Sequence, residues 1–261
     1  MANTALITGA SSGIGLELAK IHAEREGNLV LVARNIQKLN ELKQEFEAKF
    51  DISVCVIQKD LSDSNSAVEV YNELKSNDIQ IDFLFNNAGF GWNAPFSLTD
   101  FKILDEMVEL NVNTLTKLCR LFLPDMLARN SGKILNTASI AAFAPMPYMA
   151  VYGATKAYVL SLSDALHSET KNTDVSVTAV CPGPTQSNFM SFSTMEFSPM
   201  IKGKKLPSAH IVALRAYNAM LKGKRAIIPF LSNKLMVCAI KFFPKYLTVN
   251  IVEKLLGTSK N

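Results

Sequence analysis

The sequence predicts an α/β fold in which helices cover both faces of a doubly wound, parallel β-sheet. Two observations carry this prediction. Short apolar segments alternate with longer segments of helical periodicity, and the apolar segments, such as 4–8, 28–33 and 175–181, lack polar alternation. Strands of that kind are buried on both faces of a sheet. Strand–helix alternation implies parallel strands joined by right-handed crossovers.

The expected elements follow one another along the chain without a linker or an internal repeat. We expect strands at 4–8, 28–33, 52–58, 81–86, 133–138, 175–181 and 225–228, and helices at 13–26, 36–50, 64–76, 99–109, 112–129 and 150–170. About seven strands in the order 3-2-1-4-5-6-7 form one Rossmann-like domain over residues 1–261. In such sheets ligands bind at the carboxyl ends of the strands.

Composition narrows the function classes. The 261 residues are 48% hydrophobic and carry a net charge of +4, without the clustered Lys and Arg of a nucleic-acid-binding protein. The 4 cysteines are far apart and the 3 histidines lack metal-ligand spacing, so we predict neither a disulfide frame nor a metal site. No signal peptide is evident, and no apolar run reaches the roughly 18 residues of a membrane span. The expected location is the cytoplasm.

A glycine-rich loop, Thr8-Gly9-Ala10-Ser11-Ser12-Gly13-Ile14-Gly15, follows the first strand. Glycine permits a sharp turn, a close approach to a phosphate and tight helix–sheet packing. The next helix offers its N–H groups and positive dipole end to a pyrophosphate. We therefore predict a dinucleotide site formed by Gly9, Ser11, Ser12, Gly13, Ile14 and Gly15. The alternative is a plain strand–helix turn.

The same loop contains a G-x-S-x-G pattern, which is also the nucleophile elbow of α/β-hydrolases. We reject a hydrolase because only one strand precedes this loop, whereas the elbow follows several strands. A hydrolase also needs a downstream acid and histidine, and His210 has no evident acidic partner.

The end of the second strand bears on the choice between NAD and NADP. A carboxylate that binds the ribose is expected there in NAD-binding proteins, but the sequence has Ala33 followed by Arg34. Arg34 can pair with a 2′-phosphate, and Lys38 can add a second charge. We therefore predict NADP(H) as cofactor. The alternative for Arg34 is a solvated loop charge.

Two further segments follow the third and fourth strands. Asp60, beside Leu61, can accept hydrogen bonds from the adenine amino group, or it can cap the next helix. Asn87, Ala88 and Gly89 can lie along the adenosine ribose, or form a loop held by Asn side chains.

Three residues near the fifth strand suggest proton chemistry. Tyr152 and Lys156 are four residues apart and so share one helix face. A nearby ammonium lowers the pKa of a phenol from about 10 toward the operating pH. Ser139 ends the fifth strand, where its hydroxyl can meet a substrate oxygen.

Together these segments resemble the short-chain dehydrogenase/reductase family over nearly the whole chain. The matching positions are 8–15, Asp60, 86–89, Asn111, Ser139, 152–156 and 182–185. The resemblance implies that Tyr152 protonates the carbonyl oxygen, that Ser139 positions it, and that Lys156 holds the nicotinamide ribose and tunes Tyr152. It also implies a water-linked proton path from Asn111 to Lys156.

The resemblance further implies that Pro182, Gly183 and Thr185 seat the nicotinamide, and that a loop at about 185–207 covers the substrate. That loop is rich in Phe and Met: Phe189, Met190, Phe192, Met195, Phe197 and Met200. Further apolar candidates for the substrate wall are Phe90, Trp92, Phe143, Met146, Tyr148 and Met149. We expect an apolar, medium-sized carbonyl or alcohol substrate and broad tolerance. The alternative is that these residues only pack the loop onto the body.

The predicted activity is NADPH-dependent reduction of a ketone or aldehyde. Within the same chemistry, a 3-oxoacyl thioester reductase or a hydroxysteroid dehydrogenase stays open. The intact Ser139, Tyr152 and Lys156 set argues against a nucleotide-binding module without turnover. The family is commonly dimeric or tetrameric, so we expect a homo-oligomer. An apolar, basic extension at about 230–261 is expected to cover the core or a subunit contact rather than a membrane surface.

Overall fold

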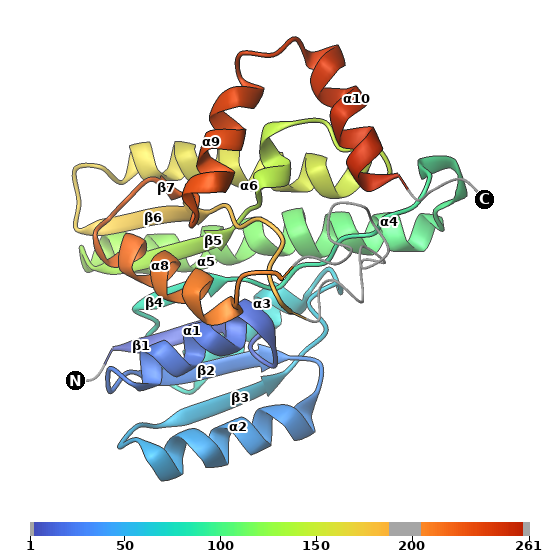
Figure 1. Cartoon of the computed structure of the whole chain (residues 1–261). Coiled ribbons are helices and arrows are strands. Elements are labelled where there is room, and N and C mark those ends of the chain that lie inside the picture. The colour runs from blue at the N-terminus through green and yellow to red at the C-terminus, as the bar shows by residue number, and fades with distance from the viewer. Residues whose placement is uncertain (1–2, 188–204, 258–261) are drawn as a thin grey trace.

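The structure is a computed structural model that describes residues 3–187 and 205–257. Its centre is a parallel seven-stranded sheet with the strand order β3-β2-β1-β4-β5-β6-β7, as predicted (Figure 1). The strands are β1 (Thr4–Thr8), β2 (Asn28–Ala33), β3 (Val54–Gln58), β4 (Phe83–Asn86), β5 (Gly132–Thr137), β6 (Val175–Val180) and β7 (Ala226–Ile227). The order turns back at β1 and β4, and this is the point where ligands bind in such sheets.

Two layers of helices cover the sheet. Helices α1 (Gly13–Ala23), α2 (Ile36–Lys49) and α8 (Ala209–Leu221) share one hydrophobic core with one face of the sheet. Helices α3 (Ser66–Ser76), α5 (Leu115–Ala128) and α6 (Ala150–Glu169) share the other core. The alternation within β1 shows why: Ala5 and Ile7 belong to the first core, and Leu6 belongs to the second.

The region between β4 and α5 differs from the expectation of two separate helices. Helix α4 (Phe101–Val108) runs through a π-helical turn, Glu109–Thr114, directly into α5. Short 3₁₀ helices, Phe96–Leu98 and Ile140–Phe143, precede α4 and follow β5. Single π turns inside α-helices are frequent at functional sites, and this one contains Asn111.

The last quarter of the chain contains helices that we did not expect from the sequence. Helix α8 was not expected. Its small residues Ala213 and Ala216 are fully buried in the core that it shares with α1. Helices α9 (Leu231–Ile240) and α10 (Lys245–Leu256) form the expected apolar, basic extension, and together they project from the body (Figure 1). Among the described residues, we find no helix with the length and apolar character needed to cross a bilayer.

Candidate active site

The glycine loop has the shape of an anion cradle. Gly9 and Gly13 have positive φ angles, 67° and 56°, a backbone conformation that favours glycine. Gly15 is needed for space, because a Cβ there would lie 2.3 Å from the Gly9 carbonyl oxygen. The first turn of α1 contains no acidic residue, and the Ser12 side chain caps none of its N–H groups. These features fit a pyrophosphate at the N-terminus of α1.

Thr8 and Asn87 hold the glycine loop against the loop that follows β4. Thr8 Oγ1 accepts hydrogen bonds from the backbone N–H groups of Asn87 and Ala88, at 2.9 and 3.0 Å. Asn87 Nδ2 donates to the Thr8 carbonyl at 3.1 Å. The expected alternative, a loop held by an Asn side chain, is therefore present, and it places Ala88 beside Gly9.

Arg34 lies at the carboxyl end of β2 with its guanidinium in solvent. Its side chain is 68% exposed, and its Nη1 lies 3.9 Å from Asp60 Oδ2. Lys38, the second expected cation, is paired with Glu41 at 2.9 Å. Arg34 is thus held near the loop edge by a weak, exposed ion pair, which leaves its donors accessible to a ligand phosphate.

Asp60 does not cap α3. Its Oδ1 accepts hydrogen bonds from the backbone N–H and the hydroxyl of Ser62, at 3.0 and 2.7 Å, which closes a local turn. Helix α3 begins at Ser66, beyond the reach of this turn. The neighbouring Leu61 is buried, and its carbonyl accepts a hydrogen bond from Thr114 at 2.8 Å.

Ser139, Tyr152 and Lys156 come together at the carboxyl end of β5. Ser139 begins the 3₁₀ turn after β5, and its Oγ accepts the Ala141 N–H at 3.1 Å. Tyr152 lies on the first turn of α6, and it forms a hydrogen bond with the Ser139 side chain. Lys156 lies one turn later, with its Nζ 5.8 Å from the centre of the Tyr152 ring. All three side chains are buried.

The electrostatics differ from the expectation that Lys156 lowers the pKa of Tyr152. Burial raises the pKa of Tyr152 to about 12, and the hydrogen bond with Ser139 only partly opposes this rise. Burial also lowers the pKa of Lys156 to about 8. Lys156 Nζ donates to the Thr137 carbonyl at 2.8 Å, so its charge is directed to the strand end rather than to the phenol oxygen. The protein groups alone therefore keep Tyr152 protonated at neutral pH.

Asn111 joins three elements through its amide. Its Oδ1 accepts the Phe90 N–H at 3.1 Å, and its Nδ2 donates to the Phe90 carbonyl at 2.9 Å and to Thr155 Oγ1 at 3.1 Å. The π turn places this side chain between the β4 loop and α6, at 1% exposure. In the structure Asn111 positions the Gly89–Phe90 segment and the helix that carries Tyr152.

The segment 182–185 lies beside Ser139, whose Oγ donates to the Pro182 carbonyl at 3.5 Å. The Pro182 carbonyl accepts the Ile140 N–H at 3.0 Å, and Thr185 Oγ1 donates to the Gly183 carbonyl at 2.9 Å. Gly183 faces Asn233 of α9, because a Cβ at Gly183 would lie 2.4 Å from Asn233 Nδ2. Helix α9 therefore packs on this segment, a contact that the sequence did not indicate.

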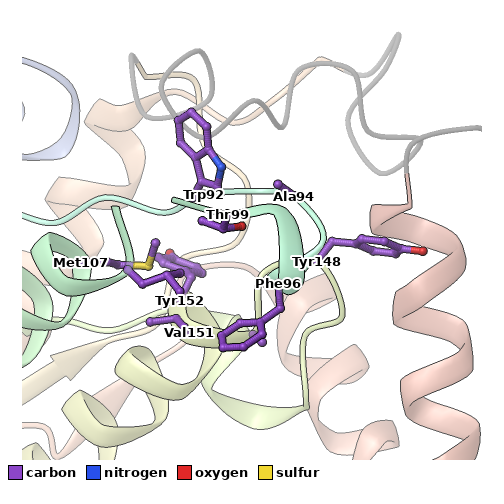
Figure 2. Close-up of a pocket in the computed structure, with 10 residues that line it drawn as sticks. Trp92, Ala94, Phe96, Thr99, Met107, Tyr148, Val151 and Tyr152 are labelled. Carbon is purple, nitrogen blue, oxygen red and sulfur yellow. The ribbon is translucent and has the colours of Figure 1, made fainter. Parts of the chain in front are cut away.

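A small pocket lined mainly by apolar side chains borders Tyr152, with room for about one water molecule (Figure 2). Its lining residues are Trp92, Ala94, Phe96, Thr99, Leu104, Met107, Tyr148, Ala150, Val151 and Tyr152. Trp92 and Tyr148 were expected in the substrate wall. Phe90, Met146 and Met149 pack in the same cluster as Tyr152. Phe143 instead packs against the core that the sheet shares with α3, α5 and α6. The Phe- and Met-rich residues 189–200 lie outside the described residues.

Sequence reasoning missed the α4 side of this pocket and the packing of α10 beside it. Met107 and Leu104 come from α4, and the fully buried Leu256 of α10 belongs to the same cluster as Tyr152. The three-residue spacing of Leu104 and Met107 indicates one helix face. Nothing local in the sequence assigns that face to the substrate pocket.

His210 has the acidic partner that the sequence did not reveal. Its Nδ1 lies 3.0 Å from Glu17 Oε2, so α8 is tied to α1. The absence of an acidic partner was therefore a wrong argument against a hydrolase. Only β1 precedes the glycine loop among the described residues, whereas a hydrolase elbow follows several strands.

Comparison with known proteins decides the family. The sequence profile of the family described as short chain dehydrogenase matches residues 3–196. The chain belongs to the short-chain dehydrogenase family. Membership of this family favours a nicotinamide-dependent oxidoreductase over the hydrolase alternative.

Two solved structures are similar to this short-chain dehydrogenase over more than nine tenths of its length. A short-chain dehydrogenase from Sphingobium yanoikuyae, in complex with NADPH, is 30% identical over 92% of both chains, with a TM-score of 0.83. A bulky-bulky ketone specific alcohol dehydrogenase from Comamonas testosteroni is 29% identical over 93% of this chain and 95% of that one, with a TM-score of 0.78.

A very-long-chain 3-oxoacyl-CoA reductase of Anas platyrhynchos is 33% identical over 184 residues, which is 68% of this chain. The match spans only 58% of that relative's length.

Proposed function

We propose that the protein reduces the carbonyl group of an apolar ketone or aldehyde with NADPH. The observation that carries this proposal is the buried group of Ser139, Tyr152 and Lys156 between the glycine loop and an apolar pocket. Similarity to a ketone-specific alcohol dehydrogenase supports the substrate class. When bound, the nicotinamide supplies the hydride that the carbonyl carbon accepts.

The protein residues supply the proton and the positioning. The Tyr152 hydroxyl donates its proton to the carbonyl oxygen, so the C=O group becomes CH–OH. Ser139 hydrogen-bonds the same oxygen and Tyr152. A phenol with a pKa of about 12 is protonated at neutral pH, so Tyr152 carries the proton that reduction needs.

Lys156 and the loops hold the cofactor in this proposal. The buried ammonium of Lys156 lies between Tyr152 and the strand end, and it would hold the nicotinamide ribose. The N-terminus of α1 binds the pyrophosphate through 9–15, and Pro182, Gly183 and Thr185 seat the nicotinamide. Asp60, Leu61 and 87–89 border the adenosine. Asn111 orders Gly89 and α6 through its three hydrogen bonds.

Exchange of Arg34 for Asp should reverse the cofactor preference. The exposed guanidinium of Arg34 lies where a 2′-phosphate is expected, and a carboxylate there repels that phosphate and can accept from a free ribose. We expect kcat/KM for NADPH to fall on the order of 100-fold, and kcat/KM for NADH to rise, in R34D. The measurement is initial rates with both cofactors on one ketone.

The matched control is Arg120→Asp. Arg120 is an exposed residue of α5, on the opposite face of the sheet from α1, and the exchange makes the same change in charge. Equal losses in R34D and R120D would show a general charge effect and contradict the assignment of Arg34 to the 2′-phosphate.

The experiment that tests the function is NADPH oxidation with a panel of ketones and aldehydes. Small polar, linear apolar and bulky aromatic carbonyls are compared at matched concentration. We expect the apolar ketones to have the highest kcat/KM, because Trp92, Met107 and Val151 offer apolar contacts beside Tyr152. The absence of NADPH oxidation across the whole panel would contradict the proposal.

A 3-oxoacyl thioester is the second candidate substrate. The observation that favours it is the 33% identity with a very-long-chain 3-oxoacyl-CoA reductase. One 3-oxoacyl thioester belongs in the panel for that reason. A kcat/KM well above that of every simple ketone would assign the protein to this second class.

A further inference from the structure

We propose that the hairpin of α9 and α10 docks onto the surface of an anionic lipid bilayer. The hairpin comprises residues 231–256, and its tip is the connection 241–244. In Figure 1 the tip is the part of the hairpin farthest from the sheet. The docking proposal does not depend on the proposed activity.

The hairpin concentrates apolar side chains in solvent. Eighteen large hydrophobic residues of the described chain are exposed, and nine of them lie on this hairpin. Phe242 at the tip has the largest exposed fraction of them, 87%, and Phe243 beside it is 53% exposed. The others are Leu231, Leu235, Met236, Tyr246, Leu247, Ile251 and Leu255. Exposed apolar surface of this extent marks an interaction site.

The positive charge of the hairpin favours an anionic partner. In the hairpin the one acidic residue is Glu253, near the end of α10, against Lys234, Lys241, Lys245 and Lys254. Lys241 and Lys245 flank the Phe242-Phe243-Pro244 tip on both sides. Aromatic rings that enter the headgroup boundary, with lysine ammonium groups beside them at the phosphates, form the pattern of an interfacial lipid anchor.

A second copy of the chain fits this surface less well. In a two-fold contact the same patch of each copy faces the other. Such a contact would bring the tip lysines of two identical hairpins together, and the one carboxylate of each hairpin, Glu253, lies in the last turn of α10, away from the tip. Lipid phosphates supply the opposite charge, and acyl chains supply the apolar environment.

The two ends of the hairpin pack against residues that border the candidate active site. Asn233 of α9 faces Gly183, and the carbonyl of Leu256 on α10 accepts a hydrogen bond from Asn93 Nδ2 at 3.3 Å. Leu256 is buried with Met107 and Tyr152. A docked tip therefore holds the pocket near the bilayer. In a corollary that rests on the proposed function, apolar carbonyl substrates that partition into lipid are concentrated there.

Flotation with vesicles tests the docking on the full chain, without any activity measurement. Wild-type protein is mixed with vesicles of phosphatidylcholine alone or of phosphatidylcholine with phosphatidylglycerol. We expect binding to the anionic vesicles, weaker binding to the neutral ones, and a loss with added salt. In F242S/F243S the partition coefficient should fall on the order of tenfold or more. In K241Q/K245Q the preference for anionic lipid should disappear.

Two control variants match these changes elsewhere on the surface. Phe101→Ser changes a phenylalanine that is 80% exposed at the start of α4, and K43Q/K49Q removes two lysines from α2. Both controls should bind vesicles as the wild type does, and circular dichroism checks that all variants are folded.

Three results would overturn the proposal. The first is a wild-type protein that does not float with anionic vesicles. The second is an equal loss of binding in the hairpin variants and the control variants. The third is a homodimer that fails to bind vesicles and that F242S/F243S converts to monomers, which would assign the tip to a second copy instead.

Discussion

Tyr152→Phe is expected to lower kcat on the order of 1000-fold while leaving the affinity for NADPH nearly unchanged. The variant keeps the aromatic ring, which is buried with Met107 and Met149, and removes only the hydroxyl that hydrogen-bonds Ser139. Without that hydroxyl, the developing alkoxide receives no proton from the protein. The measurement is kcat on the best ketone of the panel, together with NADPH binding by fluorescence titration.

Tyr158→Phe is the matched control for this variant. Tyr158 lies on the same helix, 39% exposed, and its hydroxyl is 2.9 Å from that of Thr116. The chemical change is identical, but this hydroxyl is outside the pocket. We expect nearly wild-type kcat in Y158F. If Y152F retained turnover within a few-fold of wild type, the proton donor would be another group.

The fold could be predicted from sequence because its signals are local. Unbroken apolar segments such as 28–33 predict buried strands, and the glycine loop after β1 predicts the start of α1. The alternation of strands with helices, together with right-handed crossovers, then leaves few possible strand orders in the sheet. Helix α8 was missed although its signal is also local: its buried residues Val212, Ala213, Ala216, Tyr217 and Met220 recur at helical spacing.

In the candidate site, too, the relations between residues close in sequence could be predicted, and those between distant residues could not. Tyr152 and Lys156 are one helical turn apart, so their relation is visible in the sequence. The pairing of Arg34 with Asp60, of His210 with Glu17 and of Asn111 with Phe90 joins residues far apart in the chain. Such contacts depend on the tertiary arrangement. The high pKa of Tyr152 also follows from burial in the folded chain, which a four-residue spacing does not reveal.

Gly15→Ala should disrupt the cofactor site through one methyl group. Gly15 lies in the first turn of α1, and alanine would otherwise favour that helix by about 1 kcal/mol. The added Cβ would lie 2.3 Å from the Gly9 carbonyl oxygen and 2.5 Å from Asn87 Nδ2. Because the nearest atom is backbone, the turn at Gly9 must move, at a cost of about 1–3 kcal/mol that outweighs the gain in helix propensity.

The expected result is a rise in the dissociation constant of NADPH on the order of 100-fold, with a lower melting temperature. Gly223→Ala is the control for replacing a glycine where the added Cβ meets no close neighbour. Gly223 has a φ of 60° at the end of α8, and a Cβ there has no neighbour nearer than Ser176 Cβ at 3.8 Å. It should cost about 1 kcal/mol of stability and leave the NADPH affinity unchanged. Wild-type NADPH affinity in G15A would show that the close packing of α1 on Gly9 does not shape the pyrophosphate site.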